Sequence, residues 1–162
     1  MQSPIGKLTI CRSNLGICQI EFGEMETRQE SLLKWLNRWS SAPVLEYAPG
    51  QLEQAKGQLQ QYFEGSRQRF DLPLDLRGTS FQLQVWRALA DIPYGEVCSY
   101  KTVAISIGQP KAVRAVGGAN NKNPVPIIIP CHRVVGANGS LVGFGGGLDI
   151  KQQLLTLEQA VT

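Results

Sequence analysis

The feature that most constrains this chain is a proline-rich stretch at residues 123–134, which reads Asn-Pro-Val-Pro-Ile-Ile-Ile-Pro-Cys-His-Arg-Val. Proline fixes the backbone angle φ and has no N–H to donate, so the stretch fits neither a helix interior nor a central strand. The isoleucines between the prolines predict a rigid, buried segment. Because that segment ends in Cys131, His132 and Arg133, Cys131 is the candidate nucleophile.

A nucleophilic cysteine needs help from its surroundings. A free thiol has a pKa of about 8.5, so it requires a base or a positive charge beside it. Consecutive side chains of an extended segment point in opposite directions, so His132 can act on Cys131 only through a bridging water or at a turn. Glu158 follows a helix with one apolar face and is the candidate carboxylate to orient the imidazole; a solvated surface glutamate is the alternative.

The other cysteines show no sign of chemistry. No two of them are spaced Cys-x-x-Cys, and a chain with one histidine offers few ligands for zinc. We therefore expect no metal, no cofactor and no disulfide framework. The remaining cysteines are expected to be inert small hydrophobes: Cys11, Cys18 and Cys98.

A glycine-rich run follows the cysteine at residues 143–147, which read Gly-Phe-Gly-Gly-Gly. Glycine lets backbone N–H groups approach a ligand without steric cost. The spacing does not fit a phosphate-binding P-loop. The run therefore predicts either a loop that contacts a ligand or a flexible loop over a pocket.

The beginning of the chain predicts an α/β unit over residues 1–70. Residues 7–11 and 17–22 are expected to be short strands, and Ser-Asn-Leu-Gly at residues 13–16 predicts a hairpin between them.

Two amphipathic helices are expected to complete this unit. Thr27 and Glu30 have the spacing of a capping box, and the leucines and tryptophans that follow, up to Trp39, recur at helical spacing and predict core packing. A second helix over residues 52–63 is expected to end at Gly65.

The second unit is expected over residues 79–162, after a linker at residues 71–78. Thr79 and Gln82 have capping-box spacing at the start of a helix. Ser99 is expected to cap a short helix, and Pro110 suits the first position of the next one, after a turn at Gly108. Two short helices around such a turn predict a helix-turn-helix.

The charge distribution differs between these units. Residues 1–78 carry nine basic and nine acidic side chains, whereas residues 79–162 carry seven basic and four acidic ones, so the whole excess of +3 lies in the second unit. This excess is compatible with a polyanionic partner. The chain shows neither a secretory signal nor an apolar run long enough for a membrane, so we expect an intracellular protein, cytoplasmic or, in a eukaryote, nuclear.

These motifs together resemble the O6-alkylguanine-DNA alkyltransferases. The stretch Pro-Cys-His-Arg-Val at residues 130–134, with Asn-Pro-Val-Pro upstream, is similar to the active-site motif of that family. The resemblance covers nearly the whole chain, from Ser-Pro-x-Gly-x-Leu at residues 3–8 to Leu-Leu-x-x-Glu at residues 154–158. It also includes Phe-x-x-x-Val-Trp from residue 81, Ile-Pro-x-Gly from 92, Ser-Tyr at 99, Arg-Ala-Val-Gly-Gly from 114 and Gly-Gly-Gly-Leu from 145.

The resemblance implies a fold and a partner. The fold is an α/β N-terminal domain resembling ribonuclease H, followed by a mainly α C-terminal domain with a winged-helix-like helix-turn-helix. The partner is double-stranded DNA that contains O6-alkylguanine, bound in the minor groove with the damaged base flipped out. Arg114 would take the place of the flipped nucleotide and Tyr100 would crowd the adjacent phosphate. The DNA-binding residues implied are Tyr100, Ala112, Val113, Arg114, Ala115 and Gly117.

The resemblance also implies a single-turnover reaction. Cys131 would take the alkyl group, with a water between it and His132, and Glu158 behind His132. Tyr100 and the Gly145 backbone would donate hydrogen bonds to the leaving guanine, and Asn123 would brace the turn before the active-site segment. The substrate pocket implied comprises Val134, Leu141, Phe144, Gly145 and Gly146.

Some properties stay open at this stage. Relatives often have tyrosine in place of Phe144 and serine in place of Gly145, so the tolerated alkyl size and activity on O4-alkylthymine are undetermined. We expect a monomer in solution, with cooperative assembly on DNA as an open alternative. The competing functions are a Cys-His hydrolase that turns over and a DNA-binding regulator whose cysteine is structural or a sensor. Lesion-binding relatives that lack the cysteine are disfavoured by Cys131.

Overall fold

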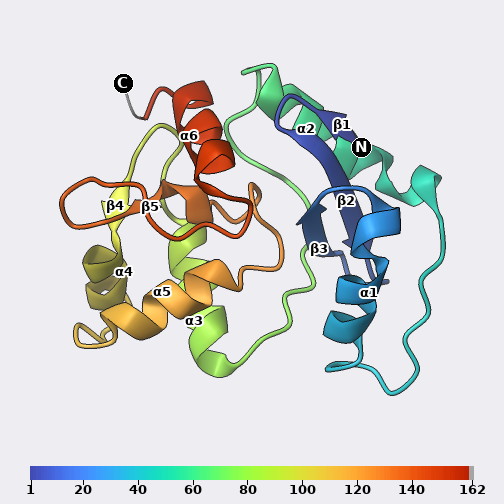
Figure 1. Ribbon diagram of the computed structural model, residues 1–162, viewed down its shortest axis with the longest axis horizontal. Helices are drawn as coiled ribbons and strands as arrows, with labels where there is room; N and C mark the ends of the chain where they lie inside the picture. Colours follow the sequence, from blue (N-terminus) through green and yellow to red (C-terminus); the bar gives the residue numbers. More distant parts are fainter. Residues whose placement is uncertain (161–162) are drawn as a thin grey trace.

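The computed structural model describes residues 1–160 and places an α/β half beside a mainly helical half (Figure 1). The first half contains an antiparallel sheet in the order β1-β2-β3, and in the second half β4 and β5 pair in parallel. The expected class, α/β followed by mainly α, is confirmed.

Within residues 1–160, no helix has the length and apolar character needed to cross a membrane. The elements are β1 (Gln2–Ser3), β2 (Gly6–Arg12), β3 (Ile17–Phe22), α1 (Met25–Leu36), η1 (Pro49–Leu52), α2 (Glu53–Phe63), α3 (Ser80–Ala90), β4 (Cys98–Ser99), α4 (Tyr100–Ser106), α5 (Val113–Asn121), η2 (Cys131–Arg133), β5 (Val134–Val135) and α6 (Leu148–Leu157).

Strands β2 and β3 form the predicted hairpin, and β1 is an additional short strand that the sequence pattern did not indicate. The segment expected to be a linker is attached to this sheet. Ile17 N donates to Pro73 O at 2.9 Å, and Asp75 N donates to Ile17 O at 2.9 Å. The chain between α2 and α3 therefore runs along β3, where Figure 1 shows it between the two halves.

Helix α1 differs from its prediction in two respects. It begins at Met25 after Glu24, so the capping box predicted at Thr27 is wrong. Thr27 lies inside the first turn, and its hydroxyl donates back to Glu24 O at 2.9 Å. The predicted core packing of the tryptophans is also wrong, because Leu32 is the buried residue of α1 and Trp39, beyond the helix end, is 41% exposed.

Helix α3 begins at the predicted capping box. Thr79 Oγ1 accepts from Gln82 N at 3.1 Å, and the Gln82 side chain accepts from Thr79 N at 3.0 Å. The apolar face of α3 is buried, as the spacing of Val85, Trp86 and Leu89 predicts.

Helices α4 and α5 pack against each other across a turn, as a helix-turn-helix requires. Ser99 caps α4 as expected and accepts from Thr102 N at 3.1 Å. The prediction that α5 starts at Pro110 is wrong, since the helix starts at Val113. Ala112 N donates to Gln109 O at 2.9 Å and closes a turn that delays the helix.

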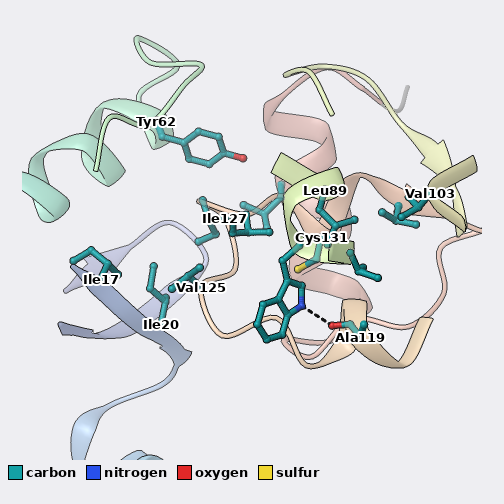
Figure 2. Packing of buried hydrophobic residues seen from close by; sticks show 14 of the residues in the cluster. Ile17, Ile20, Tyr62, Leu89, Val103, Ala119, Val125, Ile127 and Cys131 are labelled. Atoms are coloured by element: carbon teal, nitrogen blue, oxygen red, sulfur yellow. Dashed lines mark hydrogen bonds between the residues drawn. The ribbon is translucent and has the colours of Figure 1, made fainter. Parts of the chain in front are cut away.

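The core is continuous across the two halves. Figure 2 shows Val125 and Ile127 of the proline-rich stretch between Ile20 of the sheet and Leu89 of α3. The backbone joins them as well, because Ile20 N donates to Pro124 O at 2.8 Å. The stretch that leads to Cys131 is therefore held by both halves.

Candidate active site

Cys131 lies on a short 3-10 turn at the end of a braced segment. Asn123 closes this segment, since its Nδ2 donates to Ile129 O at 2.8 Å and its Oδ1 accepts from Val125 N at 3.1 Å. Ile127 adopts a φ of 76°, which is rare for a β-branched residue and requires firm support from its surroundings. The turn solves the geometric problem of an extended Cys-His pair, because residues 131–133 do not alternate in direction as they would in a strand.

The Cys131 thiol is almost fully buried, with 4% of its residue surface exposed. Burial raises its pKa to about 11, although a hydrogen bond from Asn123, the charge of Lys151 and backbone N–H groups act in the opposite direction. The backbone N–H of His132 is among the groups that act to lower the pKa of the thiol, but burial outweighs them. The thiol is protonated at neutral pH, so its proton has to be removed during reaction.

His132, the next residue along the turn, is fully buried and is the candidate acceptor of that proton. Its Nε2 lies 2.7 Å from Glu158 Oε1, and its Nδ1 has no hydrogen-bond partner among residues 1–160. Burial lowers the pKa of His132, against the opposing effect of Glu158. The ring is therefore neutral at pH 7, and a proton on Nε2 that faces the carboxylate leaves the Nδ1 lone pair free.

Glu158 is the most heavily hydrogen-bonded side chain of this region. Besides His132, Arg133 donates from Nε to Oε2 at 2.8 Å and from Nη2 to Oε1 at 3.0 Å. Tyr62 of α2 donates its hydroxyl to Oε1 at 2.6 Å, and Gly95 N lies 3.3 Å from Oε2. Burial opposes ionisation, but the bonds from His132, Arg133 and Tyr62 prevail and hold the pKa of Glu158 at about 2.

Lys151 of α6 is a buried cation close enough to Cys131 to act on its charge. Its Nζ donates to Val134 O, and to Val142 O at 2.8 Å. Burial lowers its pKa to about 8, while the nearby Cys131 acts to raise it. Tyr100 OH also donates to Val142 O, at 2.9 Å. Lys151 and Tyr100 thus fix the loop that precedes the glycine run.

Only some of the residues expected to form the substrate pocket line the cleft at Cys131. Phe144 and Gly145 line a cleft that also reaches Cys131. Val134 is buried, and its carbonyl accepts from Lys151. The remaining two do not line that cleft: Leu141 is half-buried, and Gly146 packs against the rings of Phe22 and Phe144.

The expected DNA-binding residues lie on or next to α5. Arg114 and Ala115 are exposed, and Ala112, Val113 and Gly117 are half-buried. A Cβ at Gly117 would lie 3.9 Å from the Tyr100 ring, so this end of α5 approaches Tyr100 closely. The helix thus presents small side chains and one long exposed cation near the loop that Tyr100 binds.

Sequence reasoning missed two residues of this network, Tyr62 and Lys151. Tyr62 gave no local signal, because it belongs to an ordinary apolar helix face and lies 96 positions from Glu158. Lys151 did carry one, since it shares helical spacing with Leu154, Leu155 and Glu158, all buried. A lysine in the middle of an apolar face is a buried cation that needs carbonyl or anionic partners.

Comparison with known proteins shows which family this chain resembles over its whole length. The model of the 6-O-methylguanine DNA methyltransferase ribonuclease-like domain matches residues 1–76, and that of the DNA binding domain of the same family matches residues 80–160. A methylated-DNA–protein-cysteine methyltransferase of Methanosarcina barkeri is 44% identical over 159 residues, which are 98% of this chain and 94% of the relative. The constitutive enzyme of that name from Bacillus subtilis is 43% identical over 98% of this chain and 92% of its own.

A solved structure shows the same likeness in three dimensions. The crystal structure of Mycobacterium tuberculosis OGT in complex with DNA superposes with a TM-score of 0.84 at 44% identity, and the match covers 99% of this chain and 91% of that one. The family models together span both halves, and several relatives match over almost their full length. The chain therefore belongs to the 6-O-methylguanine DNA methyltransferase family.

Proposed function

We propose that this protein repairs DNA by moving an alkyl group from guanine O6 in duplex DNA to the sulfur of Cys131, once per molecule. The observation that carries the proposal is the buried Cys131 turn, whose neighbour His132 is hydrogen-bonded to an ionised Glu158. The relatives that share nearly the whole chain are named methylated-DNA–protein-cysteine methyltransferases.

The reaction is a displacement at the alkyl carbon. A bond forms between that carbon and Cys131 Sγ while its bond to guanine O6 breaks, and the thiol proton passes to His132 through a bridging water. Glu158 stabilises the resulting imidazolium. Hydrogen bonds from Tyr100 and the Gly145 backbone, the donors we assign, stabilise the departing guanine anion. The anion is then protonated through solvent by the proton that left the thiol, which returns His132 to its neutral form. Because the product is a thioether that water does not readily cleave, the protein is consumed.

DNA binding is assigned to α5 and its surroundings. A solved relative is in complex with DNA, which supports DNA as the partner. Arg114 is exposed on α5, and we assign to it the place of the flipped nucleotide in the base stack. We further propose that the free protein is a monomer in an intracellular compartment, in keeping with its four free cysteines.

The first test measures intact-protein mass after incubation with duplex DNA that contains O6-methylguanine. We expect a gain of one methylene, limited to one per molecule and absent in Cys131→Ser. A Cys-His hydrolase would keep its mass and turn over substrate. A regulator with a structural cysteine would bind the lesion without any gain in mass.

The second test concerns Arg114. We expect Arg114→Ala to slow repair of duplex DNA far more than reaction with the free O6-methylguanine base, because a free base needs no flipping. Arg69→Ala, an exposed arginine outside α5, is the matched control. An equal loss on both substrates would overturn the flipping role.

A further inference from the structure

The cleft at Cys131 extends beyond the space that a methyl group needs. Its volume is about 380 Å³, whereas one water molecule occupies about 30 Å³ in the liquid and a methyl group is of similar size. Cys131 lines the cleft together with Phe144 and Gly145, which we place at the base, whereas Tyr100 and Val134 do not line it. The space therefore extends from the reaction centre into the N-terminal half.

The outer part of the cleft is built by the N-terminal half. Its walls there are Gln19 and Phe22 of β3, Trp35 of α1, and Trp39 just beyond that helix. Trp35 is half-buried and Trp39 is 41% exposed, so neither ring is needed to fill the core. Phe22 also packs against Phe144 of the glycine-rich loop, with ring centroids 5.7 Å apart, so aromatic walls continue across the domain boundary.

Two buried acceptors in this cleft lack a partner among residues 1–160. Asn120 is 1% exposed and its Oδ1 accepts no hydrogen bond; Gln19 is 7% exposed and the same holds for its Oε1. Both residues line the cleft, Asn120 on the C-terminal side and Gln19 on the N-terminal side. Buried acceptors without partners are costly, so their presence points to a ligand or solvent that donates to them.

We propose that the outer part of the cleft, between β3 and α1, receives the far end of long O6 substituents that carry an aromatic ring and a hydroxyl or amide donor. Trp35 and Trp39 flank the ring, and Gln19 accepts from the donor. The N-terminal half thus sets which large lesions this protein repairs. This inference rests on the proposed alkyl transfer and names part of its substrate range.

The test compares two lesions in the same duplex, O6-ethylguanine and O6-[4-(4-hydroxyphenyl)butyl]guanine. Both lesions react at an unactivated primary carbon, so their intrinsic reactivity towards a thiol is matched. The rate of long-group transfer divided by the rate of ethyl transfer therefore reports on how the protein binds the far end of the long substituent. We expect the unmodified protein to transfer both groups. Trp35→Ala should lower the ratio of long to ethyl transfer at least fivefold, and Gln19→Leu should lower it about threefold.

Trp39→Ala provides a second variant at an exposed position, in case Trp35→Ala does not fold, and should lower the ratio at least twofold. Tyr47→Ala, an aromatic truncation at a residue that is 91% exposed and outside the cleft, is the matched control and should keep the ratio of the parent. Ethyl transfer without transfer of the long group, or a ratio unchanged by both tryptophan variants, overturns the inference. If the protein transfers neither the ethyl group nor the long group, the proposed function is overturned instead.

Discussion

Two buried thiols of this protein have nearly the same accessibility but different surroundings. Cys131 is 4% exposed and Cys18 of β3 is 3% exposed, and burial raises the pKa of each to about 11. Near Cys18 the charge of Asp75 disfavours the thiolate further, partly offset by Arg77. Near Cys131 the neighbouring groups, led by Asn123, act in favour of the thiolate.

The comparison shows that a buried thiol is unreactive unless its surroundings contain a group that accepts its proton and a space that admits the electrophile. With a pKa of about 11, on the order of one Cys131 in 10⁴ is a thiolate at pH 7. Cys131 has a neutral histidine beside it and a cleft that reaches it, whereas Cys18 has neither. Four changes test this difference, taken from the largest expected effect to the smallest.

The largest effect is expected from Glu158→Gln. This change leaves the Arg133 cation buried without its anion, and we expect the free energy of unfolding to fall by about 3–5 kcal/mol in urea. Because folding lowers the pKa of Glu158 to about 2, the parent gains this stabilisation above about pH 4.3, the ordinary pKa, and loses it as the pH falls to 2. The variant should lack that acid-dependent loss.

The matched change beside Cys18 is Asp75→Asn. Asp75 and Arg77 form an ion pair at 2.7 Å, but the Arg77 side chain is 27% exposed, so solvent screens the loss. We expect a cost of about 1 kcal/mol. Equal costs for the two variants would contradict the idea that the Cys131 region contains the more tightly coupled network.

The second change, His132→Gln, removes the proton acceptor. We expect alkyl transfer to slow by about 10²–10⁴-fold at neutral pH, the usual contribution of a general base. The parent rate should not rise between roughly pH 7 and pH 9, above the lowered pKa of His132 and below that of Cys131, and it should decline around pH 8 as Lys151 loses its charge. The variant rate should instead rise with pH throughout that range. A parallel profile in both proteins would argue against proton transfer to His132.

The third change, Lys151→Met, removes the cation that favours the Cys131 thiolate. We expect the pKa of Cys131 to rise further and the transfer rate to fall about tenfold, which corresponds to about 1.4 kcal/mol. Lys151→Arg keeps the charge and should retain more of the rate. Lys101→Met, at an exposed position of α4, is the control for loss of a positive charge in DNA binding. If Lys101→Met and Lys151→Met lose the same rate, the effect lies in DNA binding.

The smallest effect is expected from Tyr62→Phe, which removes one of the hydrogen bonds to Glu158 and leaves the ring in place. A loss of about 0.5–1.5 kcal/mol in unfolding free energy should accompany a few-fold slower transfer. Tyr94→Phe is the control, because the Tyr94 hydroxyl bonds Leu157 O at 3.3 Å rather than Glu158. If only stability changes, Tyr62 joins the two halves without influencing the reaction.

Sequence patterns predicted local structure best where the deciding bonds are local. The capping box of Thr79 and Gln82 lies within four residues, and it forms as predicted. The same spacing at Thr27 and Glu30 does not cap α1, because the helix begins two residues earlier, at Met25, and Thr27 lies within its first turn. Pro110 likewise has the right residue type for a helix start, but the turn closed by Ala112 moves the start to Val113.

The sequence by itself determined the family resemblance, the fold class and the candidate nucleophile, because these depend on residue types at fixed short spacings around Cys131. Only the tertiary structure decided which groups surround that thiol. Tyr62 and Glu158 meet across 96 positions, Lys151 turns inward to two carbonyls, and Trp35 faces a cleft rather than the core. Such contacts depend on how distant helix faces pack together, and periodicity within one segment shows that a face is apolar without showing which partner it meets.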